Sequence, residues 1–123
     1  MKINMQRSNA PVFWLLFGAG GMLSALVGPM LVFITGIAVP LGLLLSKDSL
    51  SYPHVLAFTH SWIGAAFLFA VVVLFFWHAG HRIFHSLHDL GIHTGVVAKL
   101  FCYGLPLIAT LITVYALVSI KYF

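Results

Sequence analysis

The sequence predicts an all-α integral membrane protein with three transmembrane helices. Of its 123 residues, 62% are hydrophobic, and six Lys or Arg and two Asp or Glu are the only formal charges. The mean hydropathy is +1.10, far above that of a soluble domain. Three stretches, 8–46, 49–81 and 100–120, contain no charged residue. Each stretch exceeds the roughly 20 residues that a helix needs to span a bilayer.

The first helix is expected over about 11–39. Pro11 is favoured in the first turn of a helix, and Pro40 follows the expected end. A bend is expected where Gly28 and Pro29 interrupt the backbone hydrogen-bond ladder. The apolar run is longer than the roughly 7 to 15 residues of a signal-peptide core, so we expect an uncleaved helix rather than a cleaved leader.

The second helix is expected over about 53–90 and the third over about 96–120. Ser51 suits the N-cap of the second helix, with Pro53 in its first turn. This helix continues into a histidine-rich segment and therefore extends beyond the bilayer at one end. Pro106 is expected to kink the third helix rather than to end it.

The composition excludes several functions. About 25 residues per crossing leave almost nothing for an extramembrane domain. Residues 1–123 are therefore interpreted as a single membrane-anchor domain, and soluble chemistry must belong to another chain. The basic residues are scattered singly, so no cluster exists to bind a nucleic acid backbone. Cys102 is the only cysteine, which excludes an intrachain disulfide and leaves too few thiolates for an iron–sulfur cluster.

The distribution of basic residues predicts a cytoplasmic N-terminus. The positive-inside rule places the side with more Lys and Arg in the cytoplasm. This orientation also brings the histidine-rich end of the second helix and the Trp14 end of the first helix to the same side, so the two ends can form one site. It places Lys2, Arg7, Arg82 and Lys99 inside and Lys47 and Lys121 outside.

The segment Trp77–Asp89 (WHAGHRIFHSLHD) ends an otherwise uncharged apolar run with an arginine, four histidines and an aspartate. On a helix these groups share one broad stripe, which faces protein or headgroups rather than lipid tails. One interpretation is interfacial, with cations that reach lipid phosphates and complement the helix dipole. The other is a proton-handling site, because imidazoles titrate near neutrality and a guanidinium stabilises negative charge on a ligand. The stripe consists of His78, His81, Arg82, His85, His88 and Asp89.

The first helix carries a second candidate group at the same end. Trp14, Phe17 and Gly18 follow the spacing i, i+3, i+4 and therefore share a face. They supply an indole N–H donor, an aromatic wall and a gap beside the backbone, which suit a flat ring that carries a carbonyl group. The alternative is that Trp14 belongs to the belt of aromatic residues at the membrane interface.

Metal binding is a further interpretation of the histidines. Paired histidines at i, i+4 can ligate zinc, and single histidines from two helices can ligate a haem iron. A structural zinc site would need more ligands on a second element, but the first and third helices contain no histidine. We therefore expect no metal site, and a haem would need its second axial ligand from another subunit.

Three blocks of sequence can be taken together with the three-helix layout: PVFWLLFGAGGMLSA (11–25), LSYPHVLAF (50–58) and HRIFHSLHDLGIH (81–93). They resemble the D subunit of fumarate reductase, the smaller membrane anchor of bacterial quinol:fumarate reductase. The resemblance covers nearly the whole chain. It implies a four-subunit complex of the bacterial inner membrane, in which a flavoprotein with FAD reduces fumarate and an iron–sulfur protein carries the clusters. The C and D anchors pack together and bind menaquinol on the cytoplasmic side.

The resemblance also implies roles for individual residues, although this chain would not be catalytic by itself. Trp14 would donate its indole N–H toward a quinone oxygen, and Phe17 and Gly18 would shape the pocket around the ring. Arg82 would stabilise negative charge on the ring. Proton transfer toward the cytoplasm would pass through His81, His85 and His88. The quinol-binding residues of this anchor would thus be Trp14, Phe17, Gly18, His81, Arg82 and His85.

The sequence departs from the family pattern at two positions. His78 stands where the pattern has a non-histidine, and Phe84 stands where it has a histidine. His78 keeps a second hypothesis open, a haem-binding cytochrome-type anchor like those of related succinate dehydrogenases. The fumarate reductases that the chain most resembles lack haem, so we expect none. A third hypothesis is a purely structural anchor, whose polar stripe binds the iron–sulfur partner.

Overall fold

The computed structural model describes residues 9–123, and every regular element within them is helical. Three segments are long and apolar enough to cross a membrane: Ala10–Leu41, Trp62–Asp89 and Val96–Tyr122. This result confirms the predicted class, an all-helical membrane protein with three spans. In chain order the elements are α1 (Ala10–Phe33), a π-helical segment (Ile34–Ala38), α2 (Val39–Leu41), a 3₁₀ turn (Lys47–Leu50), α3 (Tyr52–His60), α4 (Trp62–Asp89) and α5 (Val96–Tyr122).

The first span starts as the sequence predicts, with Pro11 in the first turn of α1. Proline is tolerated there because the first N–H groups of a helix have no intrahelical partner. The helix continues through Pro29, and its departure from α-helical hydrogen bonding comes later, in the segment Ile34–Ala38. The span ends where Gly42 adopts the left-handed backbone conformation, at φ 68°. It is therefore slightly longer than the expected 11–39.

The prediction of one continuous helix over 53–90 is wrong, because the structure divides it at Ser61. This residue has extended backbone angles, φ −68° and ψ 145°, and separates α3 from α4. Its hydroxyl donates to the Phe58 carbonyl at 2.7 Å and accepts from the Gly64 N–H at 2.9 Å, which caps α4. The sequence marks the break with three consecutive polar residues, Thr59, His60 and Ser61, the last of which is the cap.

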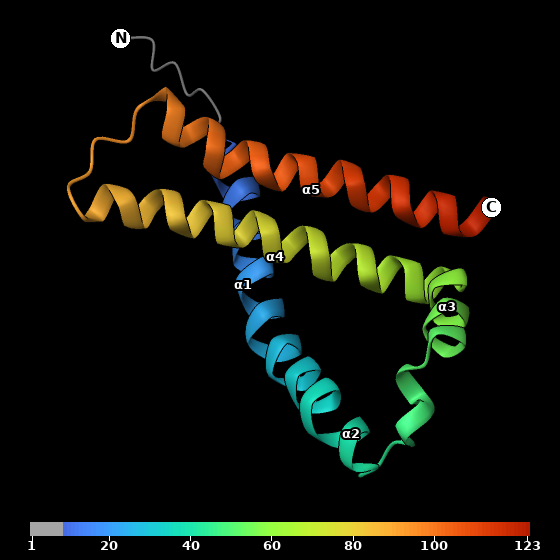
Figure 1. Cartoon of the computed structure of the whole chain (residues 1–123). Coiled ribbons are helices and arrows are strands. Elements are labelled where there is room, and N and C mark those ends of the chain that lie inside the picture. The colour runs from blue at the N-terminus through green and yellow to red at the C-terminus, as the bar shows by residue number, and fades with distance from the viewer. Residues whose placement is uncertain (1–8) are drawn as a thin grey trace, which may run out of the picture.

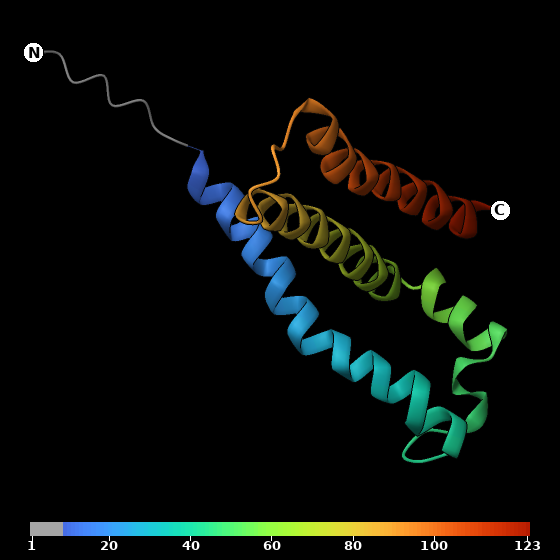
Figure 2. The same ribbon diagram turned by 60° about the vertical axis from the view of Figure 1, so that its left-hand side comes forward.

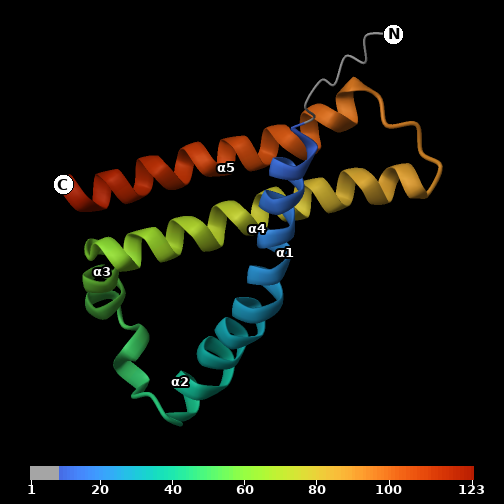
Figure 3. The same ribbon diagram turned by 180° about the vertical axis from the view of Figure 1, so that it is seen from behind.

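Helices α4 and α5 lie side by side and run antiparallel (Figures 1 and 3). The turn between them begins at Gly91, whose φ of 73° lies in the left-handed region that glycine adopts without strain. The Gly91 N–H donates to the His88 carbonyl at 3.0 Å. As predicted, Pro106 does not end the third span, which continues to Tyr122.

Gly80 allows the backbones of α4 and α5 to approach closely. It is buried, and a Cβ atom at this position would overlap the carbonyl oxygen of Cys102 and lie 2.8 Å from the side chain of Pro106. Small residues at such crossings permit the van der Waals packing that holds membrane helices together. The absence of a side chain at Gly80 is therefore a requirement of the α4–α5 pair.

Side-chain contacts hold the same two helices at separate levels. The indole N–H of Trp77 donates to the Thr110 hydroxyl at 3.0 Å. At the far end, the ammonium nitrogen of Lys121 lies 3.0 Å from the centre of the Trp62 ring. A cation over an aromatic face is stabilised by the ring quadrupole. The pair is therefore joined near its middle and at the end opposite the α4–α5 turn.

Helix α1 crosses α4 instead of lying along it (Figures 1 and 2). At the crossing, Gly20 is buried, and a Cβ there would come within 2.7 Å of the Leu74 carbonyl oxygen and 2.9 Å of the His78 Cβ. Across residues 9–123, the buried hydrophobic side chains are only Ala38, Val39 and Val71. Residues 9–123 thus have almost no core of their own, and most of their apolar surface is available to lipid or to other chains.

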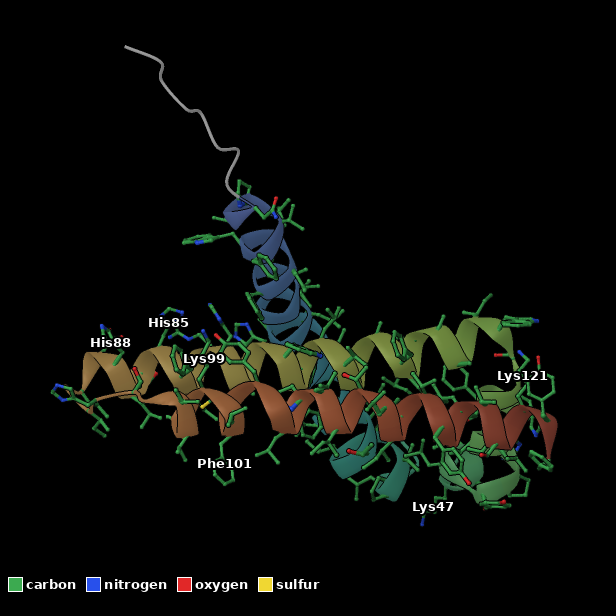
Figure 4. All side chains as sticks on the ribbon, turned by 90° about the horizontal axis from the view of Figure 1, so that it is seen from above. Lys47, His85, His88, Lys99, Phe101 and Lys121 are labelled. Carbon is green, nitrogen blue, oxygen red and sulfur yellow. The ribbon has the colours of Figure 1, made fainter. Side chains whose placement is uncertain are left out.

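The two ends of the α4–α5 pair carry different side chains. Figure 4 shows His85, His88 and Lys99 toward one end and Lys121 at the other. Lys47 lies in the connection between the first and second spans, on the side away from the start of α1. Lys2 and Arg7, which also support the predicted orientation, lie outside the described residues. The arrangement fits the predicted separation of charges at the described positions.

Candidate functional site

A cavity of about 530 Å³ lies between the first turns of α1 and the second half of α4. All six residues predicted to bind the quinol line this cavity, three from each helix. His88 does not line it and lies instead at a separate hollow formed with the α4–α5 turn. The lining residues are Ala10, Phe13, Trp14, Phe17, Gly18, His78, His81, Arg82, His85 and Asp89.

Helical periodicity explains why these side chains meet. On α1, Trp14, Phe17 and Gly18 share one face, and a Cβ at Gly18 would meet nothing within 4 Å, so the cavity stays open beside the backbone. The stripe of α4 faces them because the two helices cross near Gly20, about one turn further along α1. The crossing therefore places the two predicted groups against each other.

His81 is held by contacts from three helices. Its ring stacks on Phe17 of α1, with centroids 3.9 Å apart and an interplanar angle of 4°. The neighbouring ring of His85 lies edge-on, 4.3 Å away at 63°. From α5, the Tyr103 hydroxyl lies 3.1 Å from the His81 Nδ1. The imidazole therefore has a defined orientation at the wall of the cavity.

His78 occupies the inner end of the cavity. Its Nδ1 lies 2.9 Å from the carbonyl oxygen of Phe17, and since a carbonyl only accepts, the proton of this bond sits on Nδ1. The ring edge lies against α1 at Gly21, where a Cβ would be 2.7 Å from Cε1 and 3.3 Å from Nε2. His78 thus links α1 to α4 directly beneath Phe17.

Arg82 is the cation of the cavity. Its side chain is exposed, and no carboxylate within residues 9–123 pairs with it. Asp89 lines the same cavity from further along α4. A guanidinium without an anionic partner can bind a ligand oxygen or a carboxylate of a partner chain through charge-assisted hydrogen bonds.

The cavity is open on one side. The Trp14 side chain is 81% exposed, and the Phe13 side chain is 55% exposed, although both line the cavity. Small-molecule sites bury most of their ligand. The described residues of this chain therefore do not enclose the cavity on all sides.

Sequence reasoning missed Tyr103, the α5 residue at this site. The third helix has no histidine and no charge between Lys99 and Lys121, so it offered no polar stripe to follow. The available signal was the position of Tyr103 near the start of the third helix, at the same membrane end as the histidines. Across the described part of the chain, no three His, Cys, Asp or Glu side chains gather into a cluster that could hold a metal ion.

Comparisons with a family model and with individual known proteins point to the same family. The family model for the D subunit of fumarate reductase matches residues 4–118. The chain is similar to the fumarate reductase D subunit of Photobacterium profundum, with 48% identity over 104 residues, which cover 85% of this chain and 86% of that protein. The protein of the same name from Vibrio vulnificus is 48% identical over 115 residues, 94% of this chain and 89% of its own length. That from Haemophilus ducreyi is 37% identical over 119 residues, 97% and 98% of the two chains.

Proposed function

The chain belongs to the family of fumarate reductase D subunits, which are membrane anchors, and from that premise we propose that it forms one wall of the quinol-oxidising site of its complex. In this proposal it fixes a flavoprotein with FAD and an iron–sulfur subunit to the bacterial inner membrane, together with the C anchor. Menaquinol gives electrons to the iron–sulfur subunit, and they reduce fumarate in anaerobic respiration. The observation that carries the proposal is the cavity between α1 and α4.

The cavity fits a quinol in size and chemistry. Its volume of about 530 Å³ lies within the roughly 300–1,000 Å³ of small-molecule sites. Phe13 and Phe17 stack with centroids 6.5 Å apart and offer an apolar wall to a flat ring. The indole N–H of Trp14 and the guanidinium of Arg82 are donors for the ring oxygens. A quinol needs both an apolar enclosure and hydrogen-bond partners at opposite oxygens.

Four polar side chains of α4 have a task in the proposed reaction. Oxidation of a quinol to a quinone releases two electrons, which leave to the iron–sulfur partner, and two protons. His81 and His85, which lie in contact, each accept one proton at the cavity. Arg82 stabilises negative charge on the ring oxygens. His88, at the hollow beyond the cavity, passes protons toward the cytoplasm.

The exposure of Trp14 supports a site shared between chains. We propose that the second anchor and the iron–sulfur subunit close the open side. The charge distribution supports a cytoplasmic location for this end, because Arg82 lines the cavity and Lys99 lies at the same end, whereas Lys121 lies at the other.

The Trp14→Phe variant tests the proposed site in the assembled complex. Phenylalanine keeps the aromatic surface and removes the indole N–H, so one hydrogen bond to the quinol is lost. We expect the KM for a menaquinol analogue to rise about tenfold in quinol-dependent fumarate reduction, in line with the roughly 0.5–1.5 kcal/mol of such a bond. Trp62→Phe is the control, because Trp62 lies outside the cavity, beneath Lys121.

Two results would count against the proposed function. One is a purified chain that retains no flavoprotein or iron–sulfur partner and supports no quinol oxidation. The other is an intact, active complex in which Trp14→Phe and Trp62→Phe have the same quinol KM.

The haem hypothesis has a separate optical test. A haem iron held by His78 would need its second axial ligand from another subunit, because α1 and α5 contain no histidine. We therefore expect the visible spectrum of the purified complex to contain only flavin and iron–sulfur absorption. A Soret band that disappears in His78→Ala or in His81→Ala would instead support a haem-binding anchor.

A further inference from the structure

Tyr103 of α5 is held in a fixed position beside the histidines of α4. Its ring packs between Trp77, with centroids 6.5 Å apart at 42°, and Phe84, with centroids 5.5 Å apart at 53°. Its hydroxyl lies 3.1 Å from the Nδ1 of His81 and makes no other hydrogen bond within the described residues. The hydroxyl is therefore placed by the packing of its own ring and is directed at one imidazole.

The contact with Tyr103 complements the stacking of His81 on Phe17. Phe17 covers a face of the imidazole from α1, and Tyr103 reaches its Nδ1 edge from α5. Nδ1 is thereby engaged, so Nε2 is the nitrogen left for exchange with a ligand in the cavity that His81 lines. The Nδ1 of His81 thus fixes the orientation of the ring, and its Nε2 remains free for proton transfer.

A hydroxyl suits this position because its oxygen accepts a hydrogen bond from an imidazole N–H. His81 can take a proton at Nε2 only if that nitrogen is unprotonated, so the neutral imidazole carries its proton on Nδ1 and donates it to the tyrosine oxygen. A protonated imidazole donates from both nitrogens, and the tyrosine oxygen then accepts. The same bond therefore persists in both protonation states of His81, with Nδ1 as the donor in each.

We infer that Tyr103 is a positioning residue for proton release, which keeps His81 in one orientation before and after it takes a proton from the quinol. The inference rests on the proposed function, since it requires His81 to act at a quinol site. Tyr103 does not line the cavity, so it acts on the substrate indirectly, by positioning His81. Its contribution falls on the rate of proton transfer rather than on substrate binding.

The Tyr103→Phe variant of the assembled complex tests this inference. Phenylalanine keeps the ring that packs on Trp77 and Phe84 and removes only the hydroxyl. We expect kcat for quinol-dependent fumarate reduction to fall about tenfold, the equivalent of one lost hydrogen bond. The quinol KM should stay unchanged, and the solvent deuterium isotope effect on kcat should rise, because proton transfer then limits turnover.

Two matched controls come from the same helix. Thr110→Val removes the other side-chain hydrogen bond between α4 and α5, of 3.0 Å, at a residue outside the cavity. Tyr115→Phe removes a hydroxyl from an exposed tyrosine. Both variants should keep the wild-type kcat and isotope effect.

The outcomes separate the inference from the function on which it rests. A wild-type complex that does not oxidise quinol overturns the proposed function. An active wild type with an equally active Tyr103→Phe variant overturns the inference alone. Equal losses of kcat in Tyr103→Phe and Thr110→Val, with less assembled complex in both, would mean that Tyr103 only holds the helices together. This result would also overturn the inference.

Discussion

Replacing Arg82 by leucine is expected to lower quinol-dependent fumarate reduction at least 100-fold while the complex stays assembled. The guanidinium lines the cavity and has no carboxylate partner within the described residues, so its charge is available to the ring oxygens. Removal of one preorganised donor from a developing oxyanion typically costs about 10²–10³ in rate. The measurement is menaquinol-analogue oxidation, with a soluble dye donor as the reference for the fumarate-reducing subunits.

The same experiment distinguishes the quinol site from a purely structural anchor. Lys99→Leu removes a positive charge from the same end of the molecule but from outside the cavity, and it should keep quinol oxidation near the wild-type rate. Arg82→Lys should restore part of the activity, because it keeps the charge and loses the planar fork. If Arg82→Leu instead loosened the complex and left the quinol KM of the remaining complex unchanged, the stripe would serve attachment only.

Replacing Gly80 by alanine is expected to destabilise the α4–α5 pair by about 1–3 kcal/mol, the usual cost of overpacking. The added Cβ would overlap the Cys102 carbonyl, which is backbone and cannot rotate away, and would press on Pro106. The free energy of unfolding of the full chain in mixed micelles, followed by loss of helical circular dichroism on titration with sodium dodecyl sulfate, would measure this loss.

Gly104→Ala is the matched control, because a Cβ at Gly104 meets nothing within 4 Å in this chain. Both substitutions remove one glycine from a helix interior and therefore gain similar helix propensity. Only Gly80→Ala adds an atom between helices. Equal stability of the two variants would mean that α4 and α5 do not pack at Gly80 in the membrane.

The helices and the composition of the site were predictable because both depend on local patterns. Three long uncharged stretches require spans of a definite length. The spacing of Trp14, Phe17 and Gly18 on one helix and of the histidines on another depends only on the helical repeat. The structure brings those groups to one cavity, as the shared membrane end suggested.

Most of the features that the sequence analysis missed depend on tertiary contacts. The break at Ser61 is local instead: Thr59, His60 and Ser61 interrupt the apolar run, and the Ser61 side chain caps α4. The role of Tyr103 depends on which residue of α5 faces His81, and that register is set by the fit of Gly80 against Cys102. The bond from His78 to the Phe17 carbonyl depends on where α1 crosses α4. Spacing within one helix carries no information on which residue of α5 faces His81 or on where α1 crosses α4.

The unequal attachment of the three spans has a consequence for biogenesis. Helices α4 and α5 are joined at Trp62, at Trp77 and at His81, whereas α1 meets α4 at one crossing near Gly20. During synthesis the first span leaves the ribosome before any of its contacts exist, and the later two can enter the bilayer as a helical hairpin. We expect α1 to be the last of the three spans to reach its final tilt.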